Sequence, residues 1–463
     1  MSKQLQIVTP VDGSVYAERP LASADEARAA VERAEKAQKA WRETPIAERQ
    51  RILSDGVDRM ISEKESIAEE LAWTMGRPVS AGPGEVGGFE ERARYMIEAA
   101  PEALKDIVPA EKDGFRRYVR REPVGVVLTV APWNYPYMTA VNSIWPALAA
   151  GNAVILKHAA QTVLAAERMA RVLAGAGLPD GVFQALHMDH AIAAAVMQAP
   201  PVRMVCFTGS VGAGHTVQRT LAEADGFPGA GLELGGKDPA YVRADADIGH
   251  AAAGIADGGF FNSGQSCCGI ERVYVHASVY DEFVERLCTE VRGLNLGNPL
   301  EPATSLGPMV KPEAADFARG QVNDAVAAGA RALIDPAEFA ADGGAYMAPQ
   351  VVVDVDHSMR VMTEETFGPV VGVMKVHDDD EAIELMNDSE YGLTAAIWTR
   401  DVDAADRLGQ RIETGTVYMN RCDYLDPALA WTGVKHTGRG CTLSVVGYES
   451  LTRPKSFHLR LNN

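Results

Sequence analysis

A cysteine and a glutamate, each close to a glycine, form the most reactive pair of residues in this sequence. Cys267 lies three residues after Gly264, and Glu233 stands 34 residues before the cysteine and two before Gly235. Most free cysteines are inert, small apolar residues of a core, so Cys267 alone would indicate little. A thiol near one glycine turn and a carboxylate near another indicate a nucleophile and a base that the fold brings together. The pair predicts covalent catalysis through a thiol.

An asparagine earlier in the chain offers the donor that such a reaction needs. Asn134 lies between Pro132 and Pro136, and the two prolines restrict the backbone around it. Its side-chain amide is a neutral donor that could stabilise an oxyanion without being titrated. An ordinary turn asparagine explains these residues equally well.

Three further segments carry residues that could bind a dinucleotide. A lysine at the end of an apolar run could bond a ribose hydroxyl or a phosphate. Glycines and a serine at the start of a predicted helix suit a phosphate, because the backbone can approach closely and the helix start has free N–H groups. A glutamate could hold a ribose diol while a phenylalanine packs on a ring. These candidates are Lys157, Gly209, Ser210, Gly214, Glu365 and Phe367. A surface lysine, a turn and a core aromatic residue are the alternatives.

Several candidates follow short apolar runs, the pattern of strands that are buried on both faces. Alternation of such strands with helices predicts parallel α/β sheets, which present ligands at the carboxyl ends of their strands. The alternation of strands and helices starts again after residue 239, so we expect a second α/β domain. The predicted strands are 124–130, 153–156, 204–207, 273–275, 346–353, 370–376 and 395–399, and later helices are 280–294, 312–328 and 380–387.

The N-terminal part is predicted to be helical. Ser23 and Glu26 form a capping box, which opens a first helix, and further helices are expected near 48–70 and 88–104. Residues 82–87 formally match a dinucleotide-binding fingerprint. No strand precedes them, so we interpret them as a turn before a helix. The tail, 453–461, alternates partly and is predicted to form an edge strand that could pair with another chain.

Composition indicates a globular protein of more than one domain. The chain has 463 residues, of which 47% are hydrophobic and 23% charged, and this length exceeds one ordinary core. Its N-terminus lacks the apolar core of a signal peptide, and no apolar run reaches the roughly 18 residues of a membrane span. The net charge of −19 argues against nucleic acid or a membrane surface as partner. The six cysteines follow neither disulfide nor zinc spacing, which predicts reduced thiols, no bound metal and a cytoplasmic location.

The order and spacing of the motifs closely resemble the aldehyde dehydrogenase superfamily, whose members oxidise aldehydes to carboxylic acids with NAD(P). The resemblance covers nearly the full length. The matching motifs are 133–136, 151–157, 207–214, 232–237, 264–267, 306–308 and 365–369. The resemblance implies a dinucleotide-binding domain at 1–105 and 124–236 and a catalytic domain at 237–450. It also implies a small β element at 106–123 and 451–463 that joins a homodimer or homotetramer.

The resemblance further implies a role for each candidate. Cys267 as thiolate attacks the aldehyde carbon, and the Asn134 amide and the Cys267 N–H hold the oxyanion. Hydride then leaves for the nicotinamide, and Glu233 activates the water that hydrolyses the thioester. Cofactor roles fall on Lys157 for the adenosine ribose, Trp133 and Ser210 for the pyrophosphate, and Glu365 for the nicotinamide ribose.

Two alternatives stay open. The chain could be an acylating semialdehyde dehydrogenase that passes its thioester to coenzyme A or phosphate, although a water-activating Glu233 speaks against this. It could also be a catalytically silent structural protein, although the intact Asn134, Glu233 and Cys267 speak against that. One departure concerns the cofactor: many NAD-specific members carry a glutamate where this chain has Ala160. The missing charge would not repel a 2′-phosphate, so we expect NADP or NAD, with NADP tolerated and a preference for it left open.

The same resemblance implies a substrate tunnel of mixed aromatic and polar character. Such a lining favours a small or medium polar aldehyde over a long fatty one. Asp423 and Asp426 could face an amino-aldehyde, and Arg421 the carboxylate of a semialdehyde, unless this loop is simply solvated. The implied tunnel residues are Tyr135, Thr139, Asn142, Ser266, Tyr424, Leu425 and Trp431.

Overall fold

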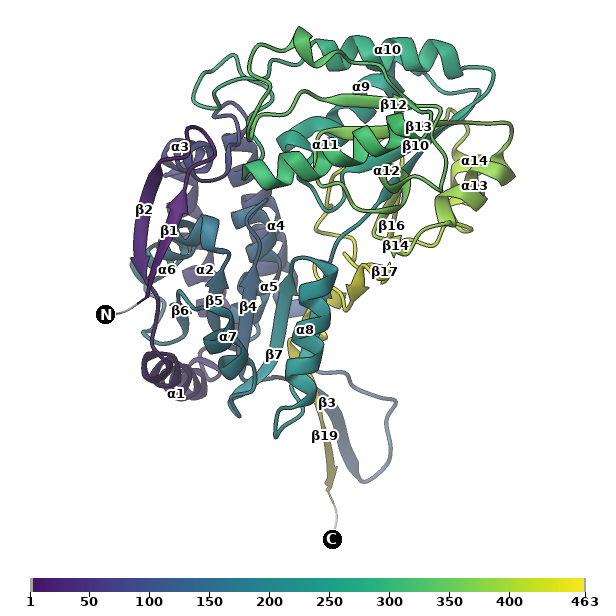
Figure 1. Cartoon of the computed structure of the whole chain (residues 1–463). Helices are drawn as coiled ribbons and strands as arrows, with labels where there is room; N and C mark the ends of the chain where they lie inside the picture. Colours follow the sequence, from purple (N-terminus) through teal and green to yellow (C-terminus); the bar gives the residue numbers. More distant parts are fainter. Residues whose placement is uncertain (1–2, 462–463) are drawn as a thin grey trace.

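The computed structural model describes residues 3–461, which form two α/β units and a projecting β ribbon (Figure 1). The first unit contains a six-stranded sheet of order β18-β8-β7-β4-β5-β6, and the second a seven-stranded sheet of order β11-β12-β13-β10-β9-β15-β16. Within these sheets every neighbouring pair is parallel except β18–β8 and β11–β12. The predicted α/β class with parallel-rich sheets is confirmed.

Alternate residues of a central strand pack into different cores. Val127 of β4 belongs to the apolar core on one face of the first sheet, and Val126 and Leu128 belong to the core on the other face. Successive side chains of a strand point to opposite faces. The continuous apolar run of β4 therefore reflects helices on both sides of the sheet.

The first unit joins its sheet to helices from the N-terminal part of the chain. Its strands are β4 (Val126–Ala131), β5 (Ala153–His158), β6 (Phe183–Ala185), β7 (Val202–Thr208), β8 (Gly229–Glu233) and β18 (Gly438–Arg439). Its helices are α1 (Ala24–Trp41), α2 (Ile46–Ile61), α3 (Lys64–Met75), α4 (Gly82–Ala103), α5 (Pro136–Ala149), α6 (Val163–Gly175), α7 (His190–Met197) and α8 (Val211–Ala222). A separate pair, β1 (Gln4–Val8) and β2 (Val15–Pro20), precedes them.

The N-terminal helices differ in two places from the sequence prediction. The capping box is present, with Ser23 Oγ accepting from Glu26 N and the Glu26 carboxylate accepting from Ser23 N. The helix expected near 48–70 is two helices, because α2 ends at Ile61 and the chain turns before α3. Residues 82–87 are not a turn before a helix, since α4 itself begins at Gly82. Pro83 is tolerated there because the first N–H groups of a helix have no intrahelical partner.

The second unit repeats the alternation of strands and helices. Its strands are β9 (Asp238–Val242), β10 (Ile270–His276), β11 (Arg331–Ala332), β12 (Gln350–Val353), β13 (Val370–Val376), β15 (Thr394–Trp398) and β16 (Thr416–Met419). Its helices are α9 (Ile248–Phe260), α10 (Tyr280–Arg292), α11 (Pro312–Ala327), α12 (Arg360–Thr363), α13 (Asp379–Asn387) and α14 (Val402–Gly409). The strand expected at 346–353 is shorter and starts at Gln350.

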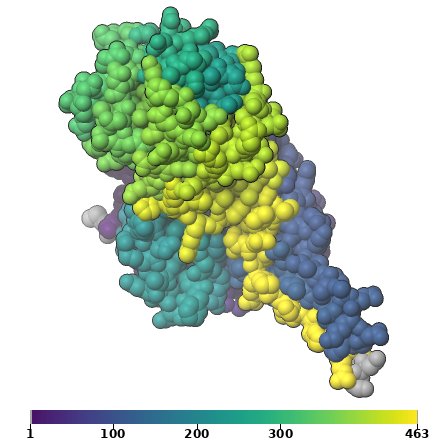
Figure 2. All heavy atoms as spheres, turned by 90° about the vertical axis from the view of Figure 1, so that its right-hand side faces the viewer, coloured from purple at the N-terminus to yellow at the C-terminus, as the bar shows by residue number. Residues whose placement is uncertain are grey.

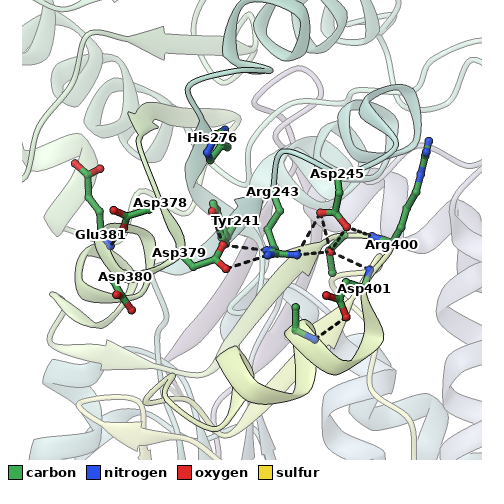
Figure 3. Close-up of polar contacts among 12 residues, drawn as sticks. Tyr241, Arg243, Asp245, His276, Asp378, Asp379, Asp380, Glu381, Arg400 and Asp401 are labelled. Atoms are coloured by element: carbon green, nitrogen blue, oxygen red, sulfur yellow. Dashed lines mark hydrogen bonds and ion pairs between the residues drawn. The ribbon is translucent and has the colours of Figure 1, made fainter.

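A network of ion pairs and hydrogen bonds connects the carboxyl ends of two inner strands of the second sheet (Figure 3). Arg243 donates from Nε and Nη2 to the two carboxylate oxygens of Asp379, at 2.9 Å each, and the Tyr241 hydroxyl donates to the same carboxylate at 2.9 Å. Asp245 accepts from the hydroxyl of Thr399 at 2.8 Å. The network ties the end of β9 to the start of α13 and the end of β15.

The C-terminal segment returns to the first unit. Trp431, Leu443 and Tyr448 belong to the core formed by α2, α4 and α5, and the segment crosses the face shown in Figure 2 in yellow. Next, β19 (Thr452–Arg460) pairs antiparallel with β3 (Phe115–Pro123) along its whole length. This ribbon extends away from both units (Figure 2). Residues 462 and 463 of the predicted oligomerisation element lie outside the described residues.

Candidate active site

The candidate residues of the first unit lie at or after the carboxyl ends of its strands. Asn134 follows β4, Lys157 lies near the end of β5, Ser210 follows β7, and Glu233 ends β8. The carboxyl ends of parallel neighbours meet at the same edge of a sheet, where α/β proteins bind their ligands. The chain then runs within a few residues from β8 into β9, so this edge also adjoins the second unit.

The loop that carries Cys267 is held in an unusual backbone conformation. Asn262 and Ser263 have positive φ angles of 53° and 56°, which cost free energy in residues other than glycine. The Asn262 side chain donates to the carbonyl of Gln265 at 3.2 Å, and the Gln265 side chain accepts from the Val310 N–H at 2.8 Å. These contacts keep the loop in one conformation, which fixes the position of the thiol.

Two glycines let three segments meet through their backbones. A Cβ on Gly236 would lie 2.3 Å from the carbonyl oxygen of Cys267, and one on Gly264 would lie 2.1 Å from that of Gly368. Gly264 also has a φ of 69°, which favours glycine. The Glu233 segment, the Cys267 loop and the segment that contains Glu365 are therefore in direct contact.

Asn134 points its amide toward the Cys267 loop. Its Nδ2 donates to the backbone carbonyl of Gln265 at 3.2 Å, and the backbone carbonyl of Asn134 accepts from Arg77 Nη2 at 2.5 Å. Arg77 is fully buried and forms an ion pair with Glu85. Because an amide carries two N–H donors, the second donor of Asn134 stays available beside the loop.

Glu233 is a buried carboxylate held by two hydroxyl groups. Thr208 Oγ1 donates to its Oε2 at 3.0 Å, and Thr442 Oγ1 donates to its Oε1 at 2.6 Å. Burial raises the pKa of Glu233 above the usual value, and the two hydroxyl donors oppose this rise. A raised carboxylate pKa suits a group that takes a proton near neutral pH.

Cys267 and Glu233 line one cavity of about 360 Å³. All seven tunnel residues implied by the sequence line it too: Tyr135, Thr139, Asn142, Ser266, Tyr424, Leu425 and Trp431. The Tyr135 hydroxyl and Asn142 Oδ1 are buried and have no hydrogen-bond partner within residues 3–461. Buried polar atoms normally have partners, so these two residues suit a polar ligand.

The charged residues of the cavity differ from those expected. Asp423 lines it and accepts from Ser266 Oγ and Cys268 Sγ, at 2.9 Å each. Asp426 is not part of the lining. Arg421 is not part of the lining either. Its guanidinium lies 3.4 Å from the centre of the Tyr424 ring.

Sequence reasoning missed the wall of the cavity that α4 provides. The residues are Gly84, Gly88, Glu91 and Arg92, together with Asp257 and Phe261 of the second unit. The first four are spaced as one face of a helix, but nothing in the sequence distinguishes this face from an ordinary packing face. Their place in the cavity depends on how α4 packs against α5.

The segments beside the thiol loop carry aromatic rings and a carboxylate of the kinds that could contact a dinucleotide. Trp133 and Phe367 meet edge to face with ring centroids 5.7 Å apart. Glu365 accepts from the Gly236 N–H at 3.0 Å, and burial raises the pKa of Glu365 to about 7. Its carboxylate is of the type that accepts hydrogen bonds from a ribose diol.

The start of α8 supplies a phosphate-binding type of site. Ser210 caps the helix by accepting from the Ala213 N–H at 3.4 Å, and the first helical N–H groups have no intrahelical partner. A Cβ on Gly214 would lie 2.7 Å from Leu234, and one on Gly209 would lie 2.7 Å from the Phe207 ring. Close packing at these glycines brings the helix start next to the end of β8.

Lys157 lies near the end of β5, and Ala160 follows this strand. Burial lowers the pKa of Lys157, and its Nζ donates to the carbonyl of His158 at 3.3 Å. Ala160 is exposed, so an extra phosphate next to it would meet solvent and no negative charge from this position. The residues present therefore fit NAD or NADP.

No cluster of three or more His, Cys, Asp or Glu residues within 3–461 could hold a metal ion. No helix in the same range is long and apolar enough to cross a membrane.

Parallel-rich sheets, a thiol loop and a carboxylate on one cavity, and cofactor-type residues at the ends of the strands are the features of an oxidoreductase of the NAD(P)-dependent class. The Aldehyde dehydrogenase family profile matches residues 1–457. The chain belongs to the aldehyde dehydrogenase family, and it oxidises aldehydes with NAD or NADP.

Individual relatives agree over nearly the whole length. The NADP(+) succinate-semialdehyde dehydrogenase 1 of Mycobacterium tuberculosis is 34% identical over 451 residues, 97% of this chain and 98% of the relative. The structure of an NADP-dependent glyceraldehyde-3-phosphate dehydrogenase from Bacillus halodurans in complex with NADP has a TM-score of 0.93 and 34% identity, with coverage of 99% and 96%. An NAD-dependent aldehyde dehydrogenase from Sinorhizobium meliloti has a TM-score of 0.95 and 33% identity, with coverage of 100% and 92%.

Proposed function

We propose that the protein oxidises a small or medium polar aldehyde to its carboxylic acid, with Cys267 as nucleophile and Glu233 as general base. The observation that carries this proposal is that Cys267 and Glu233 line the same cavity. A nucleophile and a water-activating base must both reach one substrate carbon, and a shared cavity allows this.

The reaction follows from the positions of these groups. The Cys267 thiolate attacks the aldehyde carbon, and the free N–H of the Asn134 amide together with the Cys267 backbone N–H stabilises the oxyanion. Bound NAD(P)⁺ supplies the acceptor for the hydride that leaves this carbon, and a thioester on Cys267 results. Glu233 then takes a proton from a water molecule, which attacks the thioester and releases the acid.

The proposed cofactor residues lie at or near the ends of the strands. We assign the adenosine ribose to Lys157, the pyrophosphate to Trp133, Ser210 and the backbone at Gly209 and Gly214, and the nicotinamide ribose to Glu365, with Phe367 packed alongside. The exposed Ala160 supports acceptance of NADP.

The substrate class rests on the cavity and on the named relatives. Unpartnered polar atoms of Tyr135 and Asn142 support a polar substrate. By their names, two of the relatives act on succinate semialdehyde and on glyceraldehyde 3-phosphate. Both compounds are short and polar, which suits a cavity of about 360 Å³.

The larger-scale proposals concern domains, assembly and location. We propose a cofactor domain at 1–105 and 124–236 and a catalytic domain at 237–450, whose last part packs on the first core. The β3–β19 ribbon supports assembly into a homodimer or homotetramer. All six cysteines, which lie in the described part of the chain, are free thiols, and this supports a cytoplasmic location.

The proposed function is tested by measuring NAD(P)H formation over a panel of aldehydes with both cofactors. We expect activity in the wild type and none in Cys267→Ala, because the other thiol of the lining, Cys268, is buried and donates to Asp423. Product analysis distinguishes free acid from acyl-coenzyme A when coenzyme A is added. Dehydrogenase activity in Cys267→Ala would show that the mechanism is wrong. Absence of both turnover and cofactor binding in the wild type would indicate a silent member of the fold.

A further inference from the structure

Arg92 is a buried cation in the cavity that the proposed mechanism does not use. It lies on α4, its exposed fraction is 8%, and it belongs to the lining of the cavity that holds Cys267. Its Nη1 donates to the carbonyl of Met138 at 2.6 Å. A guanidinium has five N–H donors, and within residues 3–461 Arg92 forms no other hydrogen bond and no ion pair.

The nearest buried carboxylate is already engaged. Glu85 lies two turns earlier on α4, pairs with Arg77, and accepts from the N–H groups of Tyr137 and Met138 at 2.8 and 2.9 Å. Burial lowers the pKa of Arg92, and nearby carboxylates and thiols oppose this change. Arginine stays charged in proteins despite such a lowering of its pKa.

The carboxylates of the lining form no ion pair with Arg92 within residues 3–461. Glu233 also lines the cavity and acts on Arg92 through its charge, but its two oxygens accept from Thr208 and Thr442. Glu91 and Asp257 are exposed, where solvent and salt screen them. Glu91 also accepts from the Tyr424 hydroxyl at 2.6 Å, and Asp423 accepts from Ser266 and Cys268. A buried charge without a counterion is strongly unfavourable. The cavity therefore presents a buried guanidinium that has donors free for a ligand.

We propose that Arg92 binds an oxyanion group, such as a carboxylate or a phosphate, at the end of the aldehyde substrate remote from the reacting carbon. The planar guanidinium donates two parallel hydrogen bonds to such a group, which provides both affinity and orientation. The Tyr135 hydroxyl, which has no partner, offers a further donor in the same cavity. This inference rests on the proposed function and restricts its substrate to anionic aldehydes.

The test compares aldehydes that differ in the charge of the remote group. The probes are butanal, 4-oxobutanoate and 4-trimethylammoniobutanal, which share a four-carbon chain, and glyceraldehyde 3-phosphate, which replaces the carboxylate by a phosphate. For the wild type we expect kcat/KM for 4-oxobutanoate or for glyceraldehyde 3-phosphate to exceed that for butanal at least 50-fold. The cationic aldehyde should be the poorest substrate. The better of the two anions identifies the oxyanion that the site selects.

The variant Arg92→Gln removes the charge but keeps an N–H donor for the Met138 carbonyl. We expect it to lower kcat/KM for the preferred anion about 100-fold, equivalent to about 2.7 kcal/mol, mainly through KM. Butanal oxidation should stay within about threefold of the wild type. Arg92→Lys keeps the charge without the planar fork and should recover part of the lost specificity. The matched control is Arg94→Gln, because Arg94 lies on the same helix and pairs with Asp58 and Glu90 away from the cavity.

The possible outcomes separate this inference from the proposed function. If butanal is oxidised and the wild type shows no preference for an anion, the inference is wrong while the proposed function stands. The same holds if Arg92→Gln lowers turnover of butanal and of the anion equally. If Arg92→Gln does not fold, the wild-type panel and Arg92→Lys decide the question. If no aldehyde is oxidised at all, the proposed function itself has failed.

Discussion

The Glu233 carboxylate shows how single residues set the chemistry of this site. Burial disfavours its charged form, while the hydroxyls of Thr208 and Thr442 favour it. The balance leaves a carboxylate whose pKa is raised above its usual value. Removing either hydroxyl should therefore shift the pH at which the general base becomes active.

The first prediction concerns Thr442→Val. Loss of the 2.6 Å hydrogen bond destabilises the ionised carboxylate, so the pKa of Glu233 should rise further. The acidic limb of the kcat–pH profile should move to higher pH by the same amount, as measured between pH 5.5 and 9. Thr432→Val is the control, because its hydroxyl donates to the Gly440 carbonyl instead. An unchanged acidic limb would exclude Glu233 as the titrating base.

The second prediction concerns the choice between NADP and NAD. Ala160 is exposed next to the Lys157 strand end, so Ala160→Glu should fold normally and place a negative charge where we expect the 2′-phosphate. We expect the NADP/NAD ratio of kcat/KM to fall at least tenfold, equivalent to about 1.4 kcal/mol. Ala327→Glu, which adds the same charge at an exposed position of the second unit, should not change the ratio. A ratio unaffected by Ala160→Glu would mean that the ribose lies elsewhere.

At the scale of the elements, the site depends on segments that touch without intervening side chains. Gly236 of the β8–β9 connection abuts the Cys267 carbonyl, and Gly264 of the thiol loop abuts Gly368. Interiors are close-packed and do not yield easily. A small addition at these positions should therefore displace the thiol.

The third prediction concerns Gly236→Ala. Its Cβ would lie 2.3 Å from the Cys267 carbonyl oxygen, so the thiol loop has to move. Displacement by about 1 Å can lower the rate 100-fold, and we expect a loss of kcat of at least that size. Gly87→Ala in α4 meets no atom within 4 Å and should stabilise the helix by about 0.5–1 kcal/mol without lowering kcat. Near wild-type kcat in Gly236→Ala would contradict the proposed contact between the two segments.

The fourth prediction concerns the pH dependence of stability at the end of β5. His158 is buried, its Nε2–H donates to the Pro136 carbonyl at 3.1 Å, and its Nδ1 accepts from Thr162 Oγ1 at 3.0 Å. Burial lowers the pKa of His158 to about 4, whereas an unfolded chain has about 6.5. The unfolded state therefore binds more protons between these values, and stability falls as pH falls from about 6.5 toward 4.

The measurement is the urea unfolding midpoint of the wild type and of His158→Gln at pH 7.5 and 5.5. We expect His158 to account for a loss of about 1 kcal/mol between these pH values, and the variant should lack this part of the loss. His377→Gln serves as control because His377 is exposed in the second unit. Identical pH dependence in the wild type and in His158→Gln would contradict a neutral buried imidazole.

At the scale of the whole molecule, the β3–β19 ribbon stands out in charge as well as in shape. Arg116, Arg117, Arg120 and Arg121 lie in β3, whereas the chain as a whole has a net charge of −19. Beyond its nine-residue pairing with β19, β3 pairs within the described residues only at isolated bridges, such as that between Val119 and Ile107. A basic ribbon with so little further pairing suits the acidic surface of a second copy.

The fifth prediction concerns this proposed assembly. Light scattering should give a mass of two or four times 49.6 kDa, and the double change Arg116→Glu with Arg120→Glu should weaken association at least tenfold. Electrostatic attraction between ribbon and partner is the reason, so 1 M NaCl should act in the same direction. Arg28→Glu on the exposed face of α1 is the control. A monomeric wild type, or assembly indifferent to these changes, would rule out the ribbon as the interface.

Much of the fold could be predicted from the sequence because local patterns agree with the final structure. The apolar runs gave strands β4, β5, β7, β10 and β13 close to their observed bounds, and the capping box gave the start of α1. Errors arose where a local signal allowed two outcomes. Glycines and a proline at 82–87 suit a turn, but they also suit the first turn of a helix, and packing of α4 selected the helix.

The types and spacing of Glu233 and Cys267 by themselves predicted covalent catalysis through a thiol. The role of Asn134 and the class of reaction followed from the order and spacing of the whole motif set, which resembles the aldehyde dehydrogenases. The tertiary structure alone decided which charges face the substrate. Arg421 and Asp426 are close to the tunnel residues in sequence but do not line the cavity, whereas Arg92, distant in sequence, does. Helix packing determines this, since the face that α4 turns toward the cavity depends on contacts with α5 that no local pattern encodes.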